Sequence, residues 1–83
     1  MIDILENWVV RCITADRNGQ EGLSHWGWVD IDGNRRLMQV VTSLSGEGVV
    51  ETAYRNRKDQ RELNRGNVQH FRDQCVRGVF ETR

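Results

Sequence analysis

Five cationic side chains fall within a short stretch of the second half of the chain. They are Arg55, Arg57, Lys58, Arg61 and Arg65. Guanidinium forks match phosphate oxygens in pairs, so a run dominated by Arg is suited to a phosphate backbone. Tyr54 and Phe71 lie close enough in sequence to stack on the bases of a single strand. The stretch predicts either a nucleic-acid-binding surface or a solvated face whose charges pair with acidic residues elsewhere, and we favour the solvated face.

The charges of the two halves are opposite. Residues 1–54 hold four basic and eight acidic side chains, a net charge of −4, and residues 55–83 hold eight basic and four acidic, a net charge of +4. The balance argues against a generally polybasic binder of nucleic acid or membranes. Opposed halves also permit reciprocal or head-to-tail association of two copies.

The side chains suited to metal or acid–base chemistry are few and poorly spaced. Cys12, His25, His70 and Cys75 are the candidate soft ligands, and no CxxC or HxxxH pair occurs among them. Two histidines could serve as acid and base in a metal-independent ribonuclease, but a structural role is the commoner one. No phosphate loop, dinucleotide glycine motif or serine elbow is found. We therefore expect no cofactor, no metal and no enzyme.

Two tryptophans stand two positions apart. Trp26 and Trp28 share one face if their segment is extended. Indoles on one face of a small sheet most often form core, and otherwise offer an aromatic stacking or partner surface. We expect core against a helix.

The elements that position these groups fit one domain, residues 1–83, because the chain is too short for a second core. Period-two or β-branched stretches predict strands at residues 8–14 and 23–28, which form a hairpin. Further strands are predicted at 49–54, 67–73 and 76–82. For the segment at 67–73 a helix is the alternative.

A helix is predicted over residues 35–45. Leu37, Val40, Val41 and Leu44 are spaced i, i+3, i+4, i+7, Asp32 or Asn34 can cap the first turn, and Gly46 suits the end. The predicted class is therefore α+β, a small antiparallel sheet with one main helix in the order β-β-α-β-β-β. The alternative is a strand over residues 36–44, since Val-Val-Thr favours extended chain and Asp-Gly favours a hairpin.

Membrane and secretory signals are not evident. Asp3 and Glu6 interrupt the N-terminal region, and the apolar runs are too short for a membrane span. In this setting Cys12 and Cys75 are expected to be buried reduced thiols, and the compartment is expected to be cytoplasmic.

The chain resembles a family of small bacterial proteins, the domain-of-unknown-function family 3892. Residues 11–14 (Arg-Cys-Ile-Thr) and 23–28 (Leu-Ser-His-Trp-Gly-Trp) are similar to that family's early motifs, and residues 78–83 to its closing strand. The chain departs from the pattern at Trp28, where the family has glycine, and in the polar insert at 55–67. The resemblance implies a helix at 37–44 and no particular activity.

A second resemblance is to the WYL ligand-sensing domain, an SH3-like small β-barrel. Arg57, Arg61, Leu63 and Val68 are spaced as in the stretch with which that domain recognises nucleic acid or nucleotide ligands, with Leu63 in place of an aromatic residue. The resemblance implies a barrel in which residues 36–43 are extended and the basic stretch is a site.

The expected function is a small non-enzymatic structural or protein-interaction module that associates with itself, because unpaired strand edges and opposed charges suit such contacts. The alternative is a nucleic-acid or nucleotide-ligand binding module that uses the basic stretch at residues 55–65.

Overall fold

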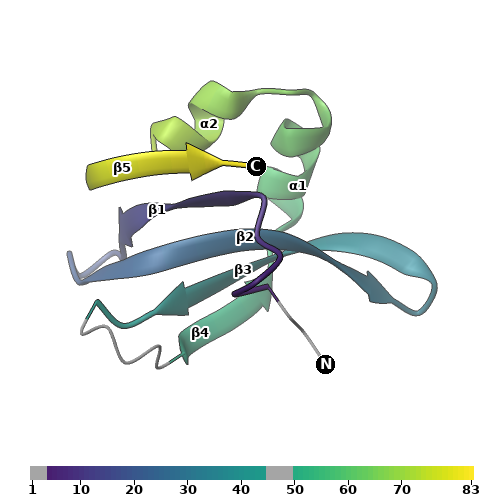
Figure 1. Ribbon diagram of the computed structural model, residues 1–83, viewed down its shortest axis with the longest axis horizontal. Coiled ribbons are helices and arrows are strands. Elements are labelled where there is room, and N and C mark those ends of the chain that lie inside the picture. The colour runs from purple at the N-terminus through teal and green to yellow at the C-terminus, as the bar shows by residue number, and fades with distance from the viewer. Residues whose placement is uncertain (1–3, 45–49) are drawn as a thin grey trace.

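The computed structural model describes residues 4–44 and 50–83, which form one antiparallel sheet and two short helices (Figure 1). The elements are β1 Val10–Ala15, β2 Glu21–Ile31, β3 Asn34–Thr42, β4 Val50–Arg55, α1 Arg57–Asn64, α2 Val68–Arg72 and β5 Arg77–Thr82. The strand order is β4-β3-β2-β1-β5, and every pairing is antiparallel. The broad expectation of a small α+β domain with an antiparallel sheet is therefore confirmed.

The predicted helix at residues 35–45 is wrong, because residues 34–42 form β3. Asp32 (φ 52°) and Gly33 (φ 77°) make a two-residue turn whose positive φ angles match the twist of a hairpin, and Ile31 pairs with Asn34 across it. The segment is buried on both faces, so its apolar residues imitate helical spacing without being helical. The predicted end at Gly46 lies outside the described residues.

The core lies mainly on the face of the sheet that the helices cover. Val10, Cys12, Trp26, Leu37 and Phe71 are buried together there. Phe71 of α2 meets the Trp26 ring edge-on, with the ring centroids 5.3 Å apart. The strand predicted at residues 67–73 is therefore wrong. The helix that was its alternative is observed, because residues 68–72 form α2.

The opposite face of the sheet has its own smaller apolar cluster. Ile4 and Trp8 of the N-terminal segment pack on Val40 of β3, with Val29 and Met38 beside them. Because Leu37 belongs to the first cluster and Val40 to the second, β3 contributes side chains to both faces. This two-sided burial is the physical reason that its sequence pattern was misleading.

Both helices connect β4 to β5, so the order of elements is β-β-β-β-α-α-β and not β-β-α-β-β-β. Figure 1 shows the helices gathered at the end of the molecule where β5 lies. The strands predicted at the start and end of the chain are present as β1, β2, β4 and β5. None of the helices in the described residues has the length and apolar character needed to span a membrane.

The two cysteines are joined. Cys12 of β1 and Cys75, which follows α2, form a disulfide with their Cα atoms 5.8 Å apart. The expectation of reduced thiols is therefore wrong for this structure. Their separation of 63 positions gives no local signal, and only the pairing of β5 with β1 brings the two segments together.

Candidate functional site

Three of the predicted basic residues meet where β4 passes into α1. Arg55 ends β4, and Arg57 and Arg61 lie one turn apart on α1. Together with Gln60 and Asn64 they line a shallow cavity of about 280 Å³. Guanidinium groups that line the same cavity can contact one ligand.

The start of α1 is held firmly against β3. The Asn56 side chain caps the helix by accepting a hydrogen bond from the backbone nitrogen of Asp59 at 3.0 Å. The backbone nitrogen of Asn56 donates to the carbonyl oxygen of Leu37, and the Leu37 nitrogen donates to Gln60 Oε1, both at 3.0 Å. These bonds fix the backbone that carries Arg57 and Arg61.

A fourth arginine, Arg36 of β3, belongs to the same electrostatic environment. Partial desolvation and then the positive charges of Arg36 and Arg57 lower the pKa of Arg55. Arg36 was missed in the sequence because it reaches Arg55 only through the pairing of β3 with β4. We call Arg36, Arg55, Arg57 and Arg61 the arginine cluster.

The arginine cluster has no acidic partner in the part of the chain that the structure describes. The ion pairs of arginine found there join Arg11 to Glu81, Arg65 to Glu62 and Arg77 to Glu21. Arg65 is therefore neutralised by Glu62 at 3.3 Å, and Lys58 does not line the cavity. The cluster is an uncompensated group of positive charges, which an anion would stabilise.

A buried carboxylate lies on the other side of α1. Asp59 is 3% exposed. Its oxygens accept hydrogen bonds from Trp26 Nε1 at 2.7 Å, Asn56 Nδ2 at 2.6 Å and Gln74 Nε2 at 3.3 Å, and one oxygen lies 2.6 Å from His70 Nε2. Asp59 thus ties the sheet, both helices and the segment before β5 to one centre.

The polar network continues across the sheet from Gln39, which is 4% exposed. Its Oε1 accepts from the Tyr54 hydroxyl at 2.7 Å and from Asn56 Nδ2 at 2.8 Å, and its Nε2 donates to Ser24 Oγ at 3.1 Å. Ser24 in turn lies 2.7 Å from the Thr14 hydroxyl. The network fixes the orientation of Tyr54.

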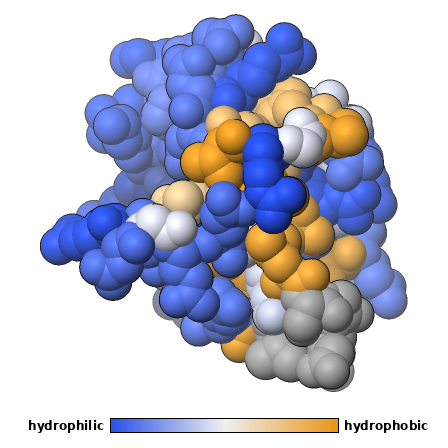
Figure 2. Space-filling model, turned by 90° about the vertical axis from the view of Figure 1, so that its left-hand side faces the viewer, coloured by the Kyte–Doolittle hydropathy of each residue, from blue (hydrophilic) through white to orange (hydrophobic). Residues whose placement is uncertain are grey.

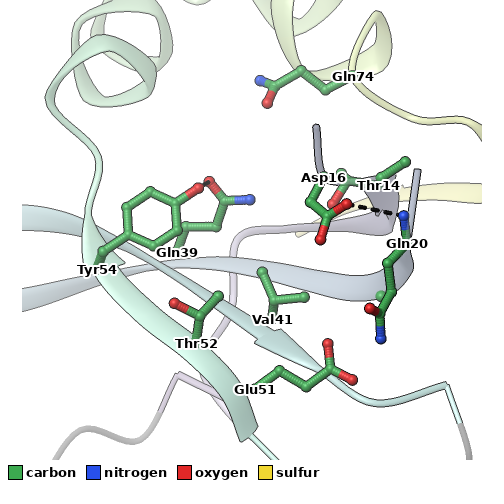
Figure 3. A pocket seen from close by; sticks show the side chains of 11 residues that line it. Thr14, Asp16, Gln20, Gln39, Val41, Glu51, Thr52, Tyr54 and Gln74 are labelled. Atoms are coloured by element: carbon green, nitrogen blue, oxygen red, sulfur yellow. Dashed lines mark hydrogen bonds between the residues drawn. The ribbon is translucent and has the colours of Figure 1, made fainter. Parts of the chain in front are cut away.

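A second and larger cavity, of about 390 Å³, lies above this network (Figure 3). Gln39 and Tyr54 line one side, and Asp16 and Gln20, from either side of the β1–β2 turn, line the other. Burial and then the charge of Asp59 raise the pKa of Tyr54.

The aromatic residues singled out in the sequence mostly serve the core. Trp26 and Phe71 are fully buried, which excludes both from a surface that stacks bases. Trp28 is partly buried against the core, and the Arg35 guanidinium lies over its ring at 4.6 Å. Tyr54 remains 44% exposed but faces the larger cavity.

The histidines are not brought together. His70 and Trp26 bond to the same carboxylate, whereas His25 precedes Trp26 on β2 and so points to the opposite face. Burial, above all, lowers the pKa of His25, whose Nδ1 is buried and has no hydrogen-bond partner in the part of the chain that the structure describes. The structure gives the hypothetical acid–base pair no common site.

Comparison with protein-family models, with curated proteins and with solved structures finds no match for this chain.

Proposed function

We propose that the protein binds the phosphate backbone of a single-stranded nucleic acid through the arginine cluster. The supporting observation is that four guanidinium groups converge without a carboxylate partner among the described residues. The chain has as many acidic as basic side chains, so a group of arginines without carboxylates gives up favourable ion pairs. A polyanion can supply those ion pairs instead.

Binding of this kind is independent of base sequence. Arginine contacts to phosphate position a strand and carry affinity, whereas base recognition needs side chains that reach base edges or stack on them. Trp26 and Phe71 are buried, and Tyr54 faces away into the larger cavity. The cluster therefore acts on the backbone charge alone.

The fold that goes with this proposal is a small SH3-like barrel. It is supported by the extended conformation of residues 34–42 and by the strand order β4-β3-β2-β1-β5. Within the described residues β4 and β5 do not pair with each other, so the proposed barrel is open between these two strands. The stretch that resembles the WYL domain lies mainly on α1, where Arg57 and Arg61 line the smaller cavity. Arg57 and Arg61 therefore share a ligand-facing position, whereas Leu63 packs against the core and Val68 lies on α2.

Anisotropy of a labelled single-stranded oligonucleotide tests the proposal. Arg61→Ala is expected to weaken binding, while Arg17→Ala removes the same charge from the exposed β1–β2 turn and serves as the matched control. Equal affinities of the two variants, or no binding by the wild type at low salt, would overturn it.

Self-association is the second candidate, because both edges of the sheet are open. Within the described residues β4 pairs only with β3, and β5 only with β1. Val79 on β5 is 73% exposed. Figure 2 views the side where β5 begins and shows hydrophobic surface gathered there, bordered by hydrophilic surface. Such an edge can pair with the same edge of a second copy.

Sedimentation distinguishes the two candidates. A dimer that ignores the oligonucleotide and dissociates on Val79→Lys favours the structural or interaction module. A monomer that takes up the oligonucleotide favours the nucleic-acid-binding one. A lysine at this edge position opposes strand pairing without entering the core.

A further inference from the structure

The larger cavity is of a size suited to a small ligand. Its volume of about 390 Å³ falls within the roughly 300–1,000 Å³ typical of ligand sites. It is lined by residues of four strands, and Gln74, from the segment before β5, lies over it (Figure 3). Because Cys75 is tied to β1 by the disulfide, Gln74 is held in place by its neighbour.

The charge of this cavity is opposite to that of the arginine cluster. Asp16, Glu51 and Tyr54 are the ionisable side chains among the described residues that line it, and no basic side chain does so. Asp16 Oδ1 accepts hydrogen bonds from the backbone nitrogens of Asn18 and Gln20, at 2.8 and 2.9 Å. Glu51 contacts no cation among the described residues.

The groups that line the cavity include several hydrogen-bond acceptors. The Tyr54 hydroxyl donates its proton to Gln39, so its oxygen offers lone pairs to the cavity. The second oxygen of Asp16 and both oxygens of Glu51 are further acceptors. A ligand that supplies several N–H donors and a positive charge complements this lining, and the Tyr54 ring adds an attractive face for a cation.

We propose that the cavity between Tyr54, Glu51 and Asp16 binds an alkylammonium or guanidinium group. It is a separate site from the arginine cluster: Tyr54 and Arg55 are consecutive residues of β4, so their side chains point to opposite faces. Binding of a cation in this cavity therefore does not depend on nucleic-acid binding by the arginine cluster. The cationic group belongs either to a free amine or to a basic side chain of a peptide, and both present the same chemistry.

The test is a titration followed by the amide shifts of the cavity residues in NMR spectra. The probes are agmatine, which carries an ammonium and a guanidinium group, an acetylated Gly-Arg-Gly amide, and the uncharged 1,4-butanediol. We expect agmatine or the peptide to shift the amides of Glu51, Tyr54 and Gln74, and the diol to leave them unchanged. The tighter of the two cationic probes identifies the source of the group.

Glu51→Gln removes one charge while it keeps the shape of the side chain, and we expect it to weaken binding about tenfold, as for the loss of a charged hydrogen bond. Asp30→Asn makes the same change of charge near the β2–β3 turn. It should alter affinity less than twofold, because interactions between solvent-exposed charges are weak. Equal shifts by the diol, no shift by either cation, or equal affinities of the two variants would overturn the proposal.

Discussion

Asp59 and the arginines that flank it on α1 are neighbours in sequence but lie in opposite environments. Asp59 is buried and bonded to side chains from the sheet and both helices, whereas Arg57 and Arg61 point to the other side of the helix and meet no carboxylate among the described residues. Positions two apart on a helix do not share a face. One short helix thus separates a polar side chain that stabilises the fold from polar side chains that are available to a ligand.

The Cys12–Cys75 disulfide should have the largest effect on the buried side of this comparison. Closing a loop between residues 63 positions apart limits the unfolded chain, and reduction is expected to lower the free energy of unfolding by about 4 kcal/mol. Urea denaturation with and without reductant measures the difference. Two titratable thiols in the unreduced, denatured protein would contradict the prediction.

Asp59→Ala should be the next most damaging change. It leaves the buried Trp26 Nε1 donor without an acceptor and removes one of the two hydrogen bonds of Asn56 Nδ2, and we expect a loss of about 3 kcal/mol in the free energy of unfolding. Asp73→Ala is the control, since the side-chain donor that its exposed carboxylate meets among the described residues is Gln69. Similar urea midpoints for the two variants would show that Asp59 is not the centre of the fold.

His25 gives a smaller effect that depends on pH. Its folded-state pKa is lowered, mainly by burial, with Arg11 acting in the same direction. The unfolded chain therefore binds the proton first, and stability should fall as the pH drops below about 6.5, the ordinary value, until it passes the folded-state pKa. His25→Gln should flatten this part of the profile in urea titrations between pH 8 and 5. An unchanged profile would assign the dependence to other groups.

Arg55 should give the smallest effect on stability, and of opposite sign to Asp59. Its pKa is lowered partly by Arg36 and Arg57, so Arg55→Gln relieves repulsion in the folded state. The thermal midpoint should stay the same or rise, while affinity for the oligonucleotide falls. A midpoint that drops as it does for Asp59→Ala would make Arg55 a structural residue.

Local patterns were sufficient for part of the fold and of the site. The hairpin of β1 and β2 and the closing strand follow from β-branched and alternating residues, and Arg55, Arg57 and Arg61 follow from their density in the sequence. The β3 segment was mistaken for a helix because Leu37 and Val40 are buried on opposite faces, which produces helical spacing in an extended chain.

The remaining features depend on contacts between distant segments. Arg36 joins the arginine cluster through strand pairing, and Cys75 reaches Cys12 through the return of β5 to β1. The acidic cavity combines Asp16 near one turn with Glu51 on the far strand. The spacing of residues in the sequence does not predict these contacts, because they arise only when the sheet has formed.

The salt dependence of oligonucleotide affinity tests the arginine cluster most directly. Each phosphate contact on a single strand contributes about 0.7 to the slope of log affinity against log salt, so four arginines predict a slope of about −3. Arg61→Ala should reduce the magnitude of that slope by about 0.7, and Arg17→Ala should leave it unchanged. A slope near zero, or one that Arg61→Ala does not alter, would contradict the proposal that the arginine cluster binds a phosphate backbone.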